Sequence, residues 1–94
     1  MSVSVRVPTI LRTYTEGASE VTVDTGEGAT LSDVIAALEA AHPGIAARVL
    51  DDNGALRRFV NVYVGDEDVR FIDGLATPVP AGGAVSIIPA VAGG

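Results

Sequence analysis

The sequence predicts a single α+β domain in which one amphipathic helix covers a mixed β-sheet. Three observations support this: two early segments alternate apolar and polar residues, a middle segment has helical spacing, and later short apolar segments are separated by turn residues. Strands that precede and follow a single helix along the sequence are typical of a two-layer α+β domain. The chain has 94 residues, which suits one domain, and its 48% hydrophobic content is enough for a packed core.

The first two predicted strands form a hairpin. A valine stands at every second position in residues 3–7, which is the period of a half-buried strand, and Pro8 ends that strand. Residues 21–24 show the same alternation. We expect residues 9–19 to connect the two strands as a long loop.

Thr30 begins the predicted helix. Asp33, three residues later, makes a variant of the capping box. Apolar residues then recur at helical spacing, and Ala41 continues the stripe. The sequence His42-Pro43-Gly44 is expected to end the helix, and its apolar face should pack on the hairpin.

The second half of the chain predicts a short helical turn at residues 45–50 and three more strands. We expect those strands at residues 59–64, 69–72 and 84–88, and a turn at residues 65–68 between the first two. Pro89 should end the last one, because proline cannot donate to a ladder. The chain therefore divides into a domain of residues 1–88 and an extended tail of residues 89–94.

Composition and charge exclude several functions. The formal net charge of -6 disfavours nucleic acid and anionic membranes as partners and suits docking onto basic enzyme surfaces. No apolar run approaches the roughly 20 residues of a membrane span, and no secretory leader is apparent, so we expect a cytoplasmic protein. The lack of cysteine excludes disulfides, thiolate catalysis and cysteine-based zinc sites. The lack of lysine excludes chains linked through the protein's own lysines.

The sequence ends in Gly93-Gly94 after an apolar stretch. Two residues without Cβ can enter a tunnel that is too narrow for other residues. Taken alone, such an ending more often marks a flexible terminus. The predicted last strand leads directly into this end, however, so we expect the carboxyl group of Gly94 to be the reactive centre.

The tail and the order of elements together resemble the ubiquitin-like β-grasp. Within it, the chain resembles the sulfur carriers, the group that includes the molybdopterin-synthase small subunit and the thiamine sulfur carrier. The tail at 89–94 is common to this group, whereas residues 8–12 and 59–71 resemble more closely the CysO-type carriers of actinobacterial cysteine synthesis. The resemblance covers nearly the whole chain. One departure is the turn at 82–84, which lacks the aspartate of many members and should affect a turn rather than chemistry.

The resemblance implies a protein co-substrate and not an enzyme. An E1-like adenylating and sulfurtransferase enzyme would use ATP to adenylate Gly94, and a persulfide sulfur would then convert the acyl adenylate into a thiocarboxylate. In the CysO-type route, a PLP-dependent cysteine synthase uses this sulfur, cysteine becomes amide-linked to Gly94, and a metal-dependent peptidase releases it. ATP and PLP belong to those partners, so the chain itself is expected to bind no cofactor and no metal.

Each tail residue has a role under this hypothesis. Gly94 carries the acyl group and Gly93 permits entry into the tunnel. The apolar stem, which an enzyme groove could hold as an extended chain, consists of Pro89, Ala90, Val91 and Ala92. Three alternatives stay open: the small subunit of a molybdopterin synthase donating sulfur to the cofactor precursor, a ubiquitin-like modifier joined to lysines of other proteins, and a β-grasp interaction module with an inert tail.

The remaining polar residues give weaker signals. His42 is expected to be a helix-end residue, and Arg57 and Arg58 ordinary surface arginines. Residues 66–68 lack the spacing of a calcium loop and predict a solvated turn. The sequence assigns no role to Asn61.

Overall fold

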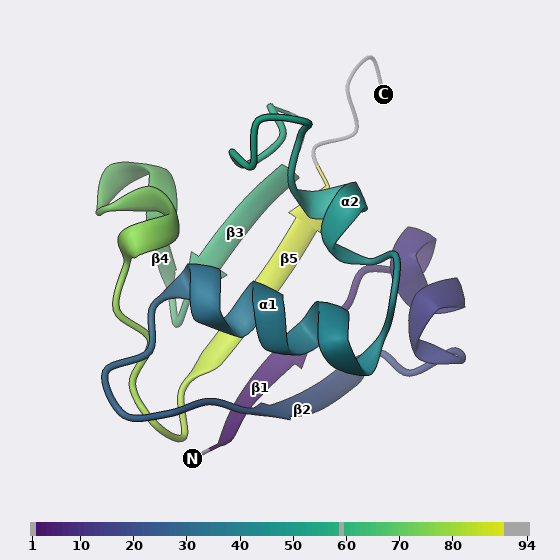
Figure 1. The fold of residues 1–94 in the computed structure, drawn as a ribbon, viewed down its shortest axis with the longest axis horizontal. Helices are drawn as coiled ribbons and strands as arrows, with labels where there is room; N and C mark the ends of the chain where they lie inside the picture. The colour runs from purple at the N-terminus through teal and green to yellow at the C-terminus, as the bar shows by residue number, and fades with distance from the viewer. Residues whose placement is uncertain (1, 59, 90–94) are drawn as a thin grey trace.

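The computed structural model describes residues 2–58 and 60–89. They form one five-stranded sheet in the order β2-β1-β5-β3-β4, with helix α1 lying across one face (Figure 1). The strands are β1 (Ser2–Arg6), β2 (Glu20–Asp24), β3 (Val60–Val64), β4 (Glu67–Asp68) and β5 (Ala84–Pro89). The helices are α1 (Leu31–Ala41), α2 (Ala46–Val49) and three short 3-10 helices, η1 (Thr9–Thr15), η2 (Val69–Phe71) and η3 (Gly74–Ala76). This two-layer arrangement confirms the expected α+β class.

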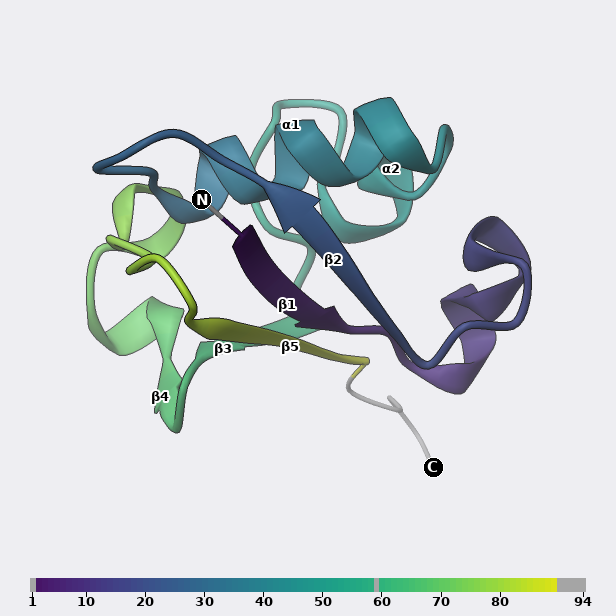
Figure 2. The same ribbon diagram turned by 90° about the horizontal axis from the view of Figure 1, so that it is seen from below.

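The last described strand lies in the middle of the sheet. β1 and β2 form the expected antiparallel hairpin, β5 runs parallel to β1, and β3 runs antiparallel to β5. β1 and β5 therefore end at the same edge of the sheet, as Figure 2 shows from a second direction. None of the helices in the described part of the chain has the length and apolar character that crossing a membrane requires.

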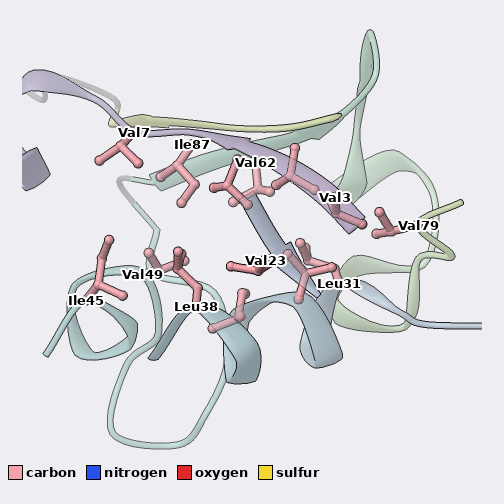
Figure 3. Close-up of a cluster of buried hydrophobic side chains, with 14 of the residues drawn as sticks. Val3, Val7, Val23, Leu31, Leu38, Ile45, Val49, Val62, Val79 and Ile87 are labelled. Atoms are coloured by element: carbon pink, nitrogen blue, oxygen red, sulfur yellow. The ribbon is translucent and has the colours of Figure 1, made fainter. Parts of the chain in front are cut away.

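The core fills the space between α1 and one face of the sheet (Figure 3). Val3, Val5 and Val7 are buried because alternate residues of a strand point to the same face, and Arg6 points to the other. The helix contributes the buried stripe Leu31, Val34, Ile35 and Leu38. Each such side chain contributes about 1.5–3 kcal/mol when fully buried. The expected extension of the stripe to Ala41 is wrong, because that residue is exposed at the end of the helix.

The predicted start of α1 is confirmed in detail. The Thr30 backbone N–H donates to the Asp33 carboxylate at 2.9 Å, and the Asp33 N–H donates to the Thr30 hydroxyl oxygen at 3.4 Å. This reciprocal capping box satisfies donors that have no partner inside the helix. The helix ends as expected at His42, which is its C-cap residue.

The region after β3 differs from the prediction. The expected strand at 69–72 is wrong: the paired residues are Glu67–Asp68, and Val69–Phe71 is the 3-10 helix η2. Gly65 takes a φ of 62°, so the chain reverses within a tight turn and pairs at once with β3. The Asp68 carboxylate then accepts the Arg70 N–H at 2.9 Å, which caps η2 and ends the pairing.

The other boundaries shift by small amounts. Residues 9–19, expected to be a loop, contain η1, in which Leu11 and Thr15 are buried. The expected helical turn at 45–50 is confirmed as α2. The expected start of β3 at Phe59 lies outside the described residues.

One carboxylate fixes the connection between the two α-helices. The Glu39 side chain accepts the N–H of Gly44 at 2.9 Å and the N–H of Ala46 at 2.9 Å. Gly44 has a φ of 98°, and a Cβ built there would lie 3.0 Å from the Tyr14 ring. The connection therefore packs directly against η1, and only glycine fits at this contact.

We expect Gly44→Ala to lower the free energy of unfolding by about 1–2 kcal/mol, because it adds backbone strain and a clash with the Tyr14 ring. Gly54→Ala is the matched control: its φ is 79°, but nothing lies within 4 Å of its added Cβ. Chemical denaturation of both variants measures the difference. Equal losses would show that the ring contact contributes nothing.

The Glu39 contacts also predict a pH dependence. Hydrogen bonds from Gly44 first and Ala46 second hold the pKa of Glu39 below its ordinary value of 4.5. When folding lowers the pKa of a carboxyl group, the ionised group stabilises the folded state fully at any pH above its unfolded-state pKa. This stabilisation is lost as the pH falls through the pKa of the folded state. The Tm difference between wild type and Glu39→Gln should therefore be largest near neutral pH and shrink below the ordinary value.

Glu27→Gln is the control for this pH series, since Glu27 is exposed in the loop before α1 and the structure gives it no hydrogen bond among the described contacts. The same Tm difference for Glu39→Gln at every pH would contradict a role for the ionised carboxylate.

Candidate functional site

The strand that leads into the predicted tail is held on both sides. β5 pairs with β1 over residues 84–86 and with β3 over residues 85–89. The strand continues one residue further than the sequence predicted, because Pro89 pairs with Val60 instead of ending the strand at Ile88. Pro89 is therefore the last residue of the sheet and not the first residue of a free stem.

The register explains why a proline is tolerated there. Gly65 N–H donates to the Ala84 carbonyl at 2.9 Å, just beyond the end of β3. Hydrogen-bonded and non-hydrogen-bonded pairs alternate along an antiparallel ladder, so the Val60–Pro89 pair falls at a non-hydrogen-bonded position. The missing N–H of Pro89 thus costs no ladder bond.

The other predicted site residues are Ala90, Val91, Ala92, Gly93 and Gly94, and they lie outside the described residues. What the structure describes is the root of the tail: the end of β5 and the side chains around it.

A groove of about 490 Å³ runs beside the end of β5. It lies between β1, η1 and β5, and Arg6, Arg12, Ser86 and Ile88 are among the residues that line it. Ile88 is 47% exposed, although isoleucine is usually buried. It points to the face of the sheet opposite α1, because its neighbour Ile87 belongs to the core.

On the other side of Ile88, Arg70 is fixed by two hydrogen bonds. One guanidinium nitrogen donates to Asn61 Oδ1 at 2.6 Å and the other donates to the Arg57 carbonyl at 2.6 Å. Asn61 is the residue of β3 that pairs with Ile88. No role for Asn61 is predicted from the sequence. Its position on a strand follows from the alternation, whereas its contact with the distant Arg70 does not.

The remaining predicted polar residues have structural contacts. Arg57, expected to be an ordinary surface residue, is exposed, and its Nε donates to the Ala47 carbonyl at 3.0 Å. Arg58 is exposed, as expected. Within residues 2–58 and 60–89, no three histidine, cysteine or acidic side chains come close enough together to hold a metal ion.

The comparisons with known proteins follow this geometry. The chain matches the model of the ThiS family over residues 5–94. It is 52% identical over 96 aligned positions to the sulfur carrier protein CysO of Mycobacterium tuberculosis, and the alignment covers all of both chains. It is also 43% identical to small archaeal modifier protein 3 of Haloferax volcanii, over 72% of this chain and 73% of that one.

Solved structures of CysO proteins share the fold. The CysO of a BexX/CysO complex from Amycolatopsis orientalis superposes with a TM-score of 0.88 at 49% identity, covering 98% of this chain and 99% of that one. The M. tuberculosis CysO structure gives a TM-score of 0.85 at 50% identity, covering 95% and 99%. These likenesses confirm the expected β-grasp fold. The chain belongs to the ThiS family, as a sulfur carrier protein homologous to CysO and not an enzyme.

Proposed function

We propose that this protein carries sulfur for cysteine biosynthesis as a thiocarboxylate on Gly94. The observation that carries the proposal is the full-length match to CysO, together with a family match that reaches Gly94 itself. The fold supports it, because β5 lies between β1 and β3 and stays paired with β3 up to Pro89, so the residue before the stem still belongs to the sheet. A rigid scaffold with a reactive extension is what an enzyme groove can hold.

The proposed chemistry takes place at the terminal carboxylate. An E1-like enzyme joins this carboxylate to the AMP portion of ATP and releases pyrophosphate. A persulfide sulfur then replaces AMP at the acyl carbon, and reductive cleavage of the remaining sulfur–sulfur bond by a thiol leaves the thiocarboxylate. Activation is needed because the charge of a carboxylate opposes attack by a nucleophile.

The proposed acceptor enzyme is a PLP-dependent cysteine synthase. The thiocarboxylate sulfur replaces the leaving group on the side-chain carbon of an activated serine, and the acyl group then moves from sulfur to the amino nitrogen. Cysteine is left amide-linked to Gly94, and hydrolysis by a metal-dependent peptidase regenerates the carrier. That a related CysO forms a complex with BexX supports docking of this chain onto a partner protein.

The tail residues keep their predicted roles, with one change. Gly94 bears the acyl group, Gly93 enters the tunnel, and the residues Ala90, Val91 and Ala92 form the stem. Pro89 is reassigned to the root, because it is still paired in β5. The stem that must reach into an enzyme is therefore shorter by one residue than the sequence predicted.

A protein-modifier function is the second candidate. The observation that favours it is the 43% identity to small archaeal modifier protein 3. It uses the same activated Gly94 but transfers the acyl group to an amine of another protein. Isopeptide-linked adducts ending in this tail, found by digesting the native proteome, would support this function over sulfur delivery.

We expect Gly94→Ala, or one residue added after Gly94, to reduce charging by about 100-fold, since small displacements of a reacting atom have effects of this size. The control is Gly26→Ala, because nothing lies within 4 Å of a Cβ at Gly26. Intact mass after incubation with ATP, activating enzyme and sulfur donor measures the sulfur-for-oxygen shift. Normal charging of both tail variants would contradict the proposal.

We expect carrier isolated from native cells to include a form with cysteine attached through an amide to Gly94. Tandem mass spectrometry of the C-terminal peptide locates the adduct. Molybdopterin synthesis predicts instead a stable complex with a larger catalytic subunit and no cysteine adduct, so co-purification in that form would contradict the cysteine route.

A further inference from the structure

The charges of this protein are separated along the direction of β5. All six arginines lie towards the edge where β5 ends. Arg6 ends β1, Arg12 donates to the Val7 carbonyl and Arg48 donates to the Tyr14 hydroxyl. Arg57 and Arg58 come just before β3, and the Arg70 guanidinium donates to the Arg57 carbonyl. The opposite edge carries an acidic group, namely Asp24, Glu27 and Asp33 around one hollow and Asp66, Glu67, Asp68 and Asp73 around β4 and η2. Seven of the twelve carboxylates belong to this acidic group, whereas Glu20 lies beside Arg6, so the net charge of -6 conceals a partial separation of charge.

The arginines near the tail keep most of their charge available. The one ion pair among the described residues joins Arg6 to Glu20, with Nε and Oε2 3.8 Å apart and both side chains well exposed. Such a pair contributes little, because solvent screens it. Arg12 instead donates to the Val7 carbonyl at 3.2 Å, and Arg70 donates to an amide and a carbonyl oxygen.

Neutral acceptors have a particular effect on a guanidinium. They fix its orientation without neutralising its charge, and an arginine that is already ordered loses less entropy on binding. The carboxylates of Glu39 and Asp51 lie in the helix layer, where they accept the backbone N–H groups of Gly44 and Asn53 and do not pair with these arginines. Apart from the exposed pair between Arg6 and Glu20, the arginines around the end of β5 are thus held in place by neutral oxygen acceptors.

These groups flank an exposed apolar residue at the root of the tail. Ile88 has Arg6 and Arg12 on its groove side and Arg70 on the side of Asn61. We name the surface formed by Arg6, Arg12, Asn61, Arg70 and Ile88 the arginine face. An exposed apolar residue flanked by arginines is typical of the centre of a protein–protein interface and not of a surface that stays in solvent.

We infer that the arginine face docks onto a carboxylate-rich rim around the tail-binding groove of the activating enzyme, an inference that rests on the proposed function. Charge complementarity selects this partner, because the acidic group lies at the opposite edge of the sheet while the arginine face lies around the end of β5. An acidic rim attracts one edge of the carrier and repels the other, so the protein arrives with its tail first. Steering of this kind raises association rates and weakens steeply with salt.

The test compares three variants of equal net charge. Arg12→Gln and Arg70→Gln remove a charge from the arginine face and retain a hydrogen-bond donor. Arg48→Gln is the matched control, since Arg48 lies on α2 and bonds to the Tyr14 hydroxyl in the helix layer. Thermal unfolding verifies that all three are folded, and Glu67→Gln tests the acidic edge.

The probe is the ATP-dependent charging activity of a desalted extract of the native cells, with a sulfur donor added and intact mass as the readout. Carrier is kept below saturation, so that the rate reports association. At about 20 mM salt we expect Arg12→Gln and Arg70→Gln to be charged about threefold to tenfold more slowly than wild type. Arg48→Gln and Glu67→Gln should match wild type or exceed it, and the differences should vanish near 0.5 M salt.

Each outcome decides the inference. Equal charging of wild type, Arg12→Gln and Arg70→Gln at low salt overturns it and leaves the proposed function standing. Slowing that is as large for Arg48→Gln also overturns it, because net charge alone would explain the effect. If the wild type is never charged, the proposed function fails, and the docking inference fails with it.

Discussion

Burial of α1 against a single face of the sheet is the interaction on which the rest of this structure depends. The valines of β1 and the inward residues of β3 and β5 gain their stability from that helix, and the strand period forces the intervening residues to the other face. That second face carries no helix in the described residues. The packing that stabilises the domain is therefore also what leaves Arg6, Asn61 and Ile88 accessible around the root of the tail.

The two faces of the sheet have different roles in the proposed function, in which the reactive group is the terminal carboxylate. A carrier that several enzymes recognise needs its recognition surface and its reacting atom close together on a rigid support. The sheet provides that support, because the strand before the tail is bonded on both sides. In the proposed docking, the side chains around this strand provide charge and orient the carrier on the enzyme. The tail is the part that is long and narrow enough to enter the enzyme.

Much of this fold could be predicted from local patterns. The valine alternation near the N-terminus, the Thr30–Asp33 cap and the stop at His42 each depend on neighbours within a few residues, and each prediction was confirmed. The wrong strand boundaries occur where a distant contact or a tight turn determines which residues pair. Gly65 reverses the chain early and shifts β4, and the pairing of Pro89 with Val60 depends on a register that no local pattern contains. Of the site, the role of Gly93-Gly94 stays a prediction from the sequence, and the bond from Arg70 to Asn61 could not be predicted because it joins residues on separate elements.

The placement of β5 also has a mechanical consequence. A pull on the tail is directed along β5, and it loads the bonds to β1 and β3 together, in shear, instead of opening them one after another. Shear across two ladders resists force better than peeling of an edge strand, because many hydrogen bonds must break at once. The domain should therefore stay folded when a partner pulls on the tail, as the proposed cycle of charging and sulfur delivery requires.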